Sequence, residues 1–516
     1  MRDLFVVSDL HLGEGVGPDE GRLHPLEDFF YDDAFRRFLE FIEKSSVDST
    51  EKPCLILNGD IFDFLTVTST PGGDYCRRHG IGVTDAEAQY GLDPTPRKSV
   101  FKLERIAQGH PVFFKALARL LAAGHDVHIL RGNHDLELYF TDVQERLGEL
   151  LVSSLGGATK ETVQERLHIH QWFYLEQGRV YIEHGNQYEA SNSIRYPLRP
   201  ILTVRKSKRK EPVLEYPLGS LFVRHFYNRV HRLNPFSPRV GSFEQYLQFL
   251  RQYNLFDLVR VTRTQYPMFI AALKPGGTAT GSRSSARQDE AERRHLDALA
   301  STTDPPAIFG QVHELRLHPK ASSKLHLIRE MLRPLVKKFL WTAGGAALAL
   351  YLWLILFNLI QAPWLFDSVL LKSTLLFLFI LLSLGSLVWL ANRVTQRLRP
   401  PPDPTVDVLA ERGARIAQLA RVKLVLMGHT HVVDKRQVAG GTATFANSGT
   451  WTATPHPWNA ILPSVRRMTL LHVVDDQVHL RRWNDDAQRL DGIPLLNTPR
   501  ERTGTWREAP RPSNRT

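Results

Sequence analysis

Residues 54–63 read CLILNGDIFD, an apolar run that stops abruptly at Asn-Gly-Asp. An apolar run of this length bounded by Gly is typical of a buried strand in a sheet that is covered on both faces. Asp60 then stands at the carboxyl end of the strand, where open α/β sheets bind their ligands. A buried carboxylate is costly unless a cation meets it. We therefore expect two metal ions at this end of the sheet.

The segments around this strand alternate between strand and helix patterns. Apolar runs at 4–7 and 127–130 predict two further strands, and helical spacing over 32–44 and 101–123 predicts helices between them. This alternation indicates parallel strands with crossover helices, and the Gly- and Pro-rich stretch 66–100 indicates a long loop near the strand ends. Later segments predict short antiparallel strands within 166–186, helices at 287–299 and 405–420, a strand at 423–427, and closing antiparallel strands at 445–450 and 467–484.

The net charge of the chain indicates an anionic partner but does not identify it. The chain has 516 residues, 43% of them hydrophobic, and a formal net charge of +11. This charge suits nucleic acid, an acidic membrane surface or a phosphorylated substrate. The two cysteines give no disulfide framework, which fits a reducing compartment.

A large segment between the strand motifs has a different character. Residues 191–335 are helical, basic and aromatic in pattern, and the basic run 205–210 is a candidate for contact with lipid headgroups. Residues 340–360 and 368–391 are each long and apolar enough to predict a transmembrane hairpin. Basic residues flank the hairpin on its outer sides, so the positive-inside rule predicts a multi-pass protein of the inner (cytoplasmic) membrane with its catalytic part facing the cytoplasm.

Five polar motifs follow apolar runs, each with a Gly or tight turn beside Asp, Asn or His. In a strand, residues two apart point to one face, so Asp9 with His11, and His429 with His431, can aim at one place if they keep strand geometry. Mixed nitrogen and oxygen ligands suit Mn, Fe, Zn or Co, and the lack of cysteine excludes a structural zinc site. The motifs are Asp9-x-His11, Gly59-Asp60, Gly132-Asn133-His134-Asp135, His184-Gly185 and Gly428-His429-x-His431.

This ordered set resembles that of the calcineurin-like metallophosphoesterases. The resemblance covers roughly 1–190 and 420–485, and it implies an α/β fold, a four-layer αββα sandwich, with a dinuclear centre that carries Mn, or else Fe or Zn. A water between two such ions becomes a hydroxide nucleophile that attacks phosphorus. By motif matching, one metal is bound by Asp9, His11 and His431, the other by Asn133, His184 and His429, and Asp60 bridges the two.

The resemblance also implies catalytic residues. His134 would stabilise the leaving group or the phosphate, Asp135 could orient its imidazole, and Arg131 is a candidate phosphate contact. Asp63 fits a loop cap better than a ligand. Surface or satisfied core roles are expected for the remaining histidines considered, which are His24, His79, His110, His125, His168, His170 and His318.

Three functions fit these residues. The stretch Asp9–Gly13 resembles the UDP-2,3-diacylglucosamine hydrolase branch, although that branch usually has Arg in place of His134. The first hypothesis is a membrane-anchored phosphoesterase that cleaves a phosphate mono- or diester or a pyrophosphate, lipid-linked or small. The second is a nuclease or nucleotide phosphodiesterase at the membrane, and nucleic acid is the less favoured partner. The third is a membrane scaffold that keeps a metal site without turnover. The oligomeric state stays open.

The expected organisation has five segments. They are a first part of the metallophosphoesterase domain at 1–190, the insertion at 191–335, the transmembrane hairpin at 336–395, a second part of the metallophosphoesterase domain at 405–495 and a disordered tail at 496–516.

Overall fold

The structure is a computed structural model, and it forms two compact units. The first unit comprises Met1–Ser242, Ala271–Lys324 and Pro402–Thr516, and the second comprises Phe243–Ile270 and Leu325–Pro401. The residues that the structure describes are 1–16, 23–45, 51–202, 211–228, 286–300, 308–317, much of 340–397, 404–454 and 465–493. The basic run 205–210 and the tail 496–516 lie outside them.

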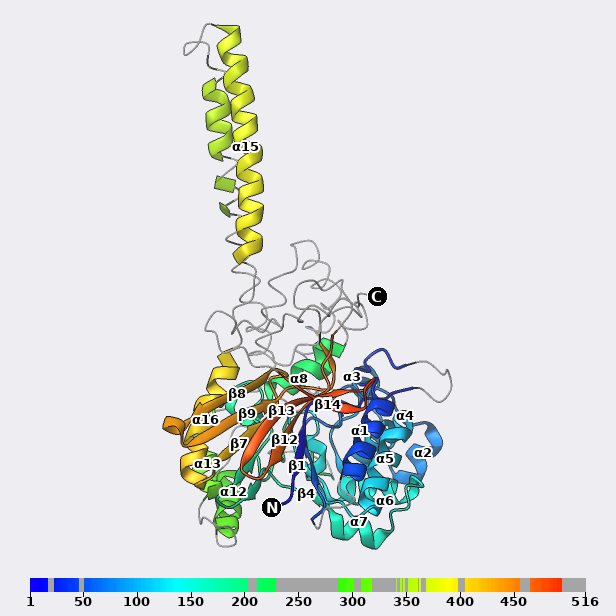
Figure 1. Cartoon of the computed structure of the whole chain (residues 1–516). Helices are drawn as coiled ribbons and strands as arrows, with labels where there is room; N and C mark the ends of the chain where they lie inside the picture. Colours follow the sequence, from blue (N-terminus) through cyan, green and yellow to red (C-terminus); the bar gives the residue numbers. More distant parts are fainter. Residues whose placement is uncertain are drawn as a thin grey trace, which may run out of the picture. The chain divides into compact units, whose positions relative to one another are not determined.

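A seven-stranded sheet carries the first three motifs. Its parallel part runs β1-β2-β3-β4, and β12 adds antiparallel to β1 (Figure 1). In order across the sheet the strands are β14 (Arg489–Gly492), β13 (Gln477–Asn484), β12 (Thr469–Val474), β1 (Leu4–Val7), β2 (Cys54–Asn58), β3 (Val127–Leu130) and β4 (Leu167–Ile169).

A five-stranded sheet carries the other two motifs. Its central strands β6, β7 and β9 are parallel, and β5 and β8 add antiparallel at its edges. In order they are β5 (Tyr174–Glu176), β6 (Val180–Ile182), β7 (Leu424–Met427), β9 (Ala443–Ser448) and β8 (Val433–Val438). A separate two-stranded ribbon pairs β10 (Ala453–Thr454) with β11 (Val465–Arg466).

Side-chain alternation along the strands builds four layers. Val6 and Ile56 of the first sheet and Ile182 and Leu426 of the second share one buried cluster, so the two sheets pack face to face. The alternate residues of each strand face outward and pack on helices. Figure 1 shows α1, α4 and α5 over one sheet and α13 and α16 over the other. The layers therefore run helix, sheet, sheet, helix.

The described helices have these bounds. On the side of the seven-stranded sheet lie α1 (Asp32–Ser45), α4 (Pro96–Gly109), α5 (Pro111–Ala122), α6 (Thr141–Ser153) and α7 (Lys160–Arg166). On the side of the five-stranded sheet lie α12 (Ala286–Ala300), α13 (Ile308–Leu315) and α16 (Pro404–Ala420). Short helices are α2 (Gly73–His79), α3 (Asp85–Tyr90), α8 (Leu218–Phe222), η1 (Leu136–Tyr139), η2 (Asn186–Tyr188), η3 (Val223–Tyr227) and η4 (Ala439–Gly441).

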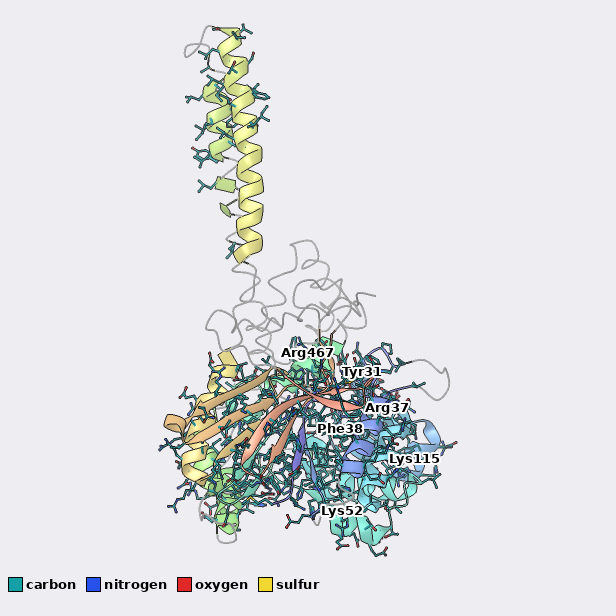
Figure 2. The ribbon with its side chains drawn as sticks, viewed as in Figure 1. Tyr31, Arg37, Phe38, Lys52, Lys115 and Arg467 are labelled. Atoms are coloured by element: carbon teal, nitrogen blue, oxygen red, sulfur yellow. The ribbon has the colours of Figure 1, made fainter. Side chains whose placement is uncertain are left out.

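Helix α1 shows how the outer layer is fixed to its sheet. Phe38, labelled in Figure 2, lies in the core and contacts the rings of Trp451 and Trp483. On the adjacent face Arg37 forms an ion pair with Asp485, just beyond β13. The helix expected at 32–44 is therefore present, and its apolar face covers the sheet as its spacing predicts.

Three local expectations were wrong. The single helix expected at 101–123 is divided into α4 and α5, because Pro111 lacks an N–H donor and starts a new helix. The stretch 66–100 contains α2 and α3, and α3 begins with a capping box between Thr84 and Glu87. Strand β4 pairs parallel to β3, although short antiparallel strands were expected here.

Part of the expected insertion belongs to the sandwich itself. Ile308, Phe309 and Val312 of α13 lie in the cluster that covers the five-stranded sheet, and Phe309 stacks on Phe173 with 4.3 Å between ring centroids. The first compact unit accordingly includes Ala271–Lys324, which the sequence pattern had assigned to the insertion.

The second unit contains the long helix α15 (Val369–Arg397) and a helical stretch at 351–360. Trp353 of that stretch contacts Phe379 of α15, with 5.6 Å between ring centroids. Over the part of the chain that the structure describes, no helix is both long and apolar enough to cross a membrane, so the predicted transmembrane hairpin has no support here.

Candidate metal centre

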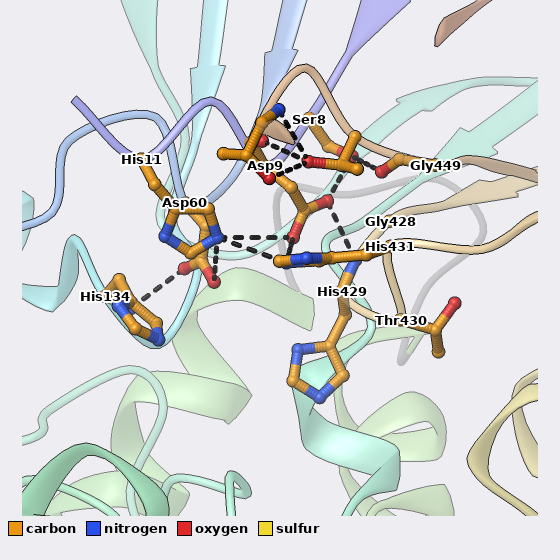
Figure 3. A network of polar contacts seen from close by, with 12 residues as sticks. Ser8, Asp9, His11, Asp60, His134, Gly428, His429, Thr430, His431 and Gly449 are labelled. Atoms are coloured by element: carbon orange, nitrogen blue, oxygen red, sulfur yellow. Dashed lines mark hydrogen bonds and ion pairs between the residues drawn. The ribbon is translucent and has the colours of Figure 1, made fainter. Parts of the chain in front are cut away.

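The polar motifs meet where strands of both sheets end. Asp9 and His11 follow β1, Asp60 follows β2, and His429 and His431 follow β7. Figure 3 shows the side chains of Asp9, His11, Asp60 and His431 turned toward one another. His184 and Asn133 follow β6 and β3 in the same way. Segments more than 400 residues apart in the chain thus contribute to one site: the amide of His429 donates to Asp9 Oδ2 over 3.0 Å.

The backbone at this site is unusual. Asp9 (φ 55°), His11 (φ 55°), Asp60 (φ 53°), His429 (φ 73°) and His431 (φ 58°) all lie in the left-handed region. Non-glycine residues rarely adopt it, and they keep it only where surrounding contacts enforce it. The side chains therefore converge through tight turns after the strands, and not through the strand alternation expected from the sequence.

One cluster joins Asp9, His11 and His431. Nε2 of His431 lies 3.2 Å from Asp9 Oδ1, and the same nitrogen lies 3.2 Å from Nε2 of His11. Nε2 of His11 is 3.9 Å from Asp9 Oδ1. These three residues can offer one ligand atom each to a single metal ion.

A second cluster joins Asp60, His184 and His429. Nε2 of His184 lies 3.2 Å from Asp60 Oδ2, and the rings of His184 and His429 are 5.2 Å apart. These residues also form a group that could hold a metal ion. Asp60 Oδ2 is 3.9 Å from Nε2 of His11, so this carboxylate stands between the two clusters.

Asn133 is held at the edge of the second cluster. The amide of the next residue, His134, donates to Asp60 Oδ1 over 2.8 Å, and Ser220 donates to the carbonyl of Asn133 over 2.9 Å. Its side-chain oxygen is buried and accepts no hydrogen bond from the described part of the chain. A buried, unsatisfied amide oxygen is expensive, and a cation is one partner that would satisfy it.

The donor set fits divalent metal ions. Nε2 of His184 and Oδ1 of Asp9 are also buried, and each lies 3.2 Å from another proposed ligand, Asp60 and His431 respectively. Two imidazole nitrogens only 3.2 Å apart, at His11 and His431, can both direct lone pairs to one cation. Imidazole and carboxylate ligands together suit Zn, Fe or Mn.

The electrostatics of the site favour positive charge. Burial alone would lower the pKa of His184, but Asp60 and Asp9 outweigh it and raise that pKa to about 10. Burial would raise the pKa of Asp9, but His184 and His431 lower it to about 2. Burial and the neighbouring His184 lower the pKa of His429 to about 3.

Asp63 contacts two histidines of the site. Its Oδ2 is 3.1 Å from Nδ1 of His134 and 3.3 Å from Nδ1 of His11. Its Oδ1 accepts the amides of Leu65 and Thr66 over 3.1 and 3.2 Å, so Asp63 also caps its loop as the sequence suggested. The cap was foreseen from the sequence, whereas Asp63 was not expected to form, with His11 and His134, a further group that could hold a metal ion.

Asp135 and Arg131, which were predicted to be catalytic together with His134, make contacts with the protein backbone. Asp135 accepts the amides of Ile61 (2.9 Å) and Gly132 (2.6 Å), and burial beside Asp60 raises its pKa to about 7. Arg131 is buried and donates to the carbonyls of Gln171 and Pro197. Asp135 thus joins the loops after β2 and β3. The carboxylate that contacts the imidazole of His134 is that of Asp63.

Comparison with known proteins agrees with this geometry. Residues 3–254 match the calcineurin-like phosphoesterase family. The match includes four of the five motifs, and the mixed α/β sheets fit a metallophosphoesterase domain. The fifth motif lies beyond the matched residues, but the structure brings His429 and His431 to the same metal-binding clusters. A search of curated proteins gives no significant match.

Proposed function

We propose that this protein is a metal-dependent phosphoesterase with a dinuclear centre. The observation that carries the proposal is the position of Asp60 between two clusters, each able to hold one cation. Asp9, His11 and His431 would hold one ion, and Asn133, His184 and His429 the other. We propose Mn²⁺ as the native metal, with Fe or Zn as alternatives.

Two divalent ions, when bound, supply Lewis-acid polarisation of a phosphoryl oxygen and lower the pKa of water at the site. The protein contributes the other elements of the reaction. Asp63 holds Nδ1 of His134. We assign the other ring nitrogen, Nε2, to stabilising the phosphate or donating a proton to the leaving oxygen.

The substrate we favour is a phosphate ester or pyrophosphate at a membrane surface, lipid-linked or small. Support comes from the apolar side chains of the second unit, among them Val369 and Leu370, each 79% exposed, and Phe377, 64% exposed. Exposed apolar patches mark surfaces that bind membranes or proteins. The basic residues that flank the apolar segments would favour contact with an acidic membrane surface, such as the cytoplasmic face of the inner membrane.

The second candidate is a nuclease or nucleotide phosphodiesterase, favoured by the net charge of +11. A panel of lipid phosphates, nucleotide-linked lipids, cyclic nucleotides and oligonucleotides separates the two, assayed with Mn, Fe or Zn. We expect turnover of a membrane phosphate by wild type and none by Asp60→Asn. Cleavage of oligonucleotides or cyclic nucleotides alone would contradict the membrane substrate, and cleavage of nothing would contradict the enzyme.

A further inference from the structure

The carboxylate of Glu189 has no role in the proposed chemistry. Glu189 lies just after η2, in the loop that follows His184. Its Oε2 is 2.7 Å from Nε2 of His429, and the two residues are 5% and 3% exposed. An imidazole has two nitrogens, and the neutral ring carries a proton on one of them. A carboxylate against Nε2 keeps the proton there, which leaves the lone pair on Nδ1.

The loop itself holds this carboxylate in place. Ser191 donates to Oε1 of Glu189 over 2.6 Å, and Asn192 donates to Oε2 over 3.0 Å. The backbone carbonyl of Glu189 accepts the amides of Asn192 (2.9 Å) and Ser193 (2.7 Å). All of these residues are buried. The loop therefore fixes the position of Glu189. Its hydrogen bond in turn fixes the orientation of the His429 ring.

Helix α8 supports the loop from behind. The amide of Gly219 donates to the carbonyl of Ser191 over 2.8 Å. A Cβ at Gly219 would stand 2.0 Å from Oδ1 of Asn192, so the helix backbone touches the loop directly. The neighbouring Ser220 holds the carbonyl of Asn133. One turn of helix thus braces the two loops that carry Asn133 and Glu189.

We propose that Glu189 is a positioning residue that orients His429 as an Nδ1 ligand, and that α8 holds Glu189 in place. The inference rests on the proposed function only in taking His429 as a metal ligand. A carboxylate on the outer nitrogen of a ligating imidazole fixes its tautomer and orientation, and its loss typically weakens metal binding roughly 10–100-fold. Residues 218–220, far from His429 in sequence, are thereby part of the metal site's support.

The test is a Mn²⁺ titration of the full-length apo protein, with a metal-binding dye as competitor. We expect two sites in wild type. In Glu189→Ala one site should weaken roughly 10–100-fold and the other should stay unchanged. Glu189→Gln should bind nearly as wild type does, because its amide oxygen still accepts the proton of Nε2. A role in folding alone would weaken both sites together and would not be rescued by Gln.

Gly219→Ala tests the brace and serves as the second variant if Glu189→Ala fails to fold. It should weaken the same single site, since its Cβ displaces Asn192. Gly310→Ala in α13 is the matched control, because its Cβ meets nothing within 4 Å. Unchanged affinities in both Glu189→Ala and Gly219→Ala, or a Gln variant as weak as the Ala variant, would overturn the inference. Wild-type protein that takes up no Mn²⁺ would instead contradict the proposed function.

Discussion

The backbone at single residues shows how strongly this site is constrained. Five non-glycine residues of this site hold left-handed φ values, and each such residue costs about 1–3 kcal/mol unless its surroundings compensate. Hydrogen bonds compensate for three of them: the amide of Asp9 donates to the carbonyl of Gly59, that of His11 to the carbonyl of Asp60, and that of His429 to Asp9 Oδ2. The folded chain therefore presents its ligands already turned inward.

A substitution of His134 distinguishes a role in catalysis from a role in metal binding. His134→Gln removes the imidazole that Asp63 holds, but it leaves the proposed metal ligands in place. We expect wild-type Mn²⁺ content and a kcat lower by roughly 10²–10⁴-fold, as for a lost acid–base group. Steady-state hydrolysis and elemental analysis of the same sample check this, with His79→Gln as the surface control. Wild-type turnover in His134→Gln would remove this residue from the mechanism.

His110 makes folding stability depend on pH. Burial alone would lower the pKa of His110, but its hydrogen bonds to Asp32 (3.0 Å) and Glu27 (3.3 Å) raise that pKa to about 9. The unfolded value is about 6.5. The stabilisation is therefore complete below about pH 6.5, and it is lost as pH rises through 9, with a magnitude on the order of 3 kcal/mol.

Thermal unfolding at pH 6.5 and 9.5 checks this prediction. Wild type should unfold at a lower temperature at pH 9.5 than at pH 6.5. This difference in unfolding temperature should be smaller in His110→Gln. His79→Gln should keep the wild-type pH dependence. Equal pH dependence in His110→Gln and wild type would show that the ion pairs of His110 do not stabilise the fold.

At the scale of elements, the site depends on how closely two strand ends approach. A Cβ at Gly132, after β3, would lie 2.1 Å from Oδ1 and 2.6 Å from the amide nitrogen of Asp60, after β2. Gly132→Ala should therefore displace Asp60, reduce bound metal and cut activity by about 100-fold, the cost of a shift near 1 Å at a reacting centre. Gly82→Ala, whose Cβ meets nothing within 4 Å, is the control. Metal content and turnover of both variants decide, and an active Gly132→Ala would contradict the close approach.

Elements also show where sequence patterns predict well and where they do not. Strands β1, β2 and β3 lie where their apolar runs indicate, because a strand buried on both faces leaves a continuous signal. Pro111 indicates the break between α4 and α5 in the sequence itself. The place of α13 in the sandwich had no local signal: its apolar residues show an amphipathic helix, but not the sheet it covers.

The same limit applies to the site. The Asp, Asn and His motifs could be predicted because each stands directly after a strand. The residues that hold these motifs in place could not be predicted. The contacts of Glu189 with His429 and of Asp63 with His134 join loops that are distant in the sequence. Periodicity gives the face of an element, and it carries no information on which loop lies opposite.

At the scale of the whole molecule, we expect the two compact units to have separable roles. The first unit contains the buried clusters of both sheets and all the proposed ligands. Replacing Leu325–Pro401 by a Gly/Ser linker should therefore preserve metal binding and hydrolysis of soluble phosphoesters. It should abolish flotation with anionic lipid vesicles. Equal flotation of the replaced and full-length proteins would contradict membrane contact through the second unit.

The most direct test of the proposed dinuclear phosphoesterase is a Mn²⁺ titration of metal-free protein, with hydrolysis of a phosphodiester such as bis(p-nitrophenyl) phosphate followed at each addition. We predict that activity is absent without metal, reaches its plateau at two ions per chain, and is not restored in Asp60→Asn at any metal concentration. Full activity in metal-free protein, or wild-type activity in Asp60→Asn, would contradict the account.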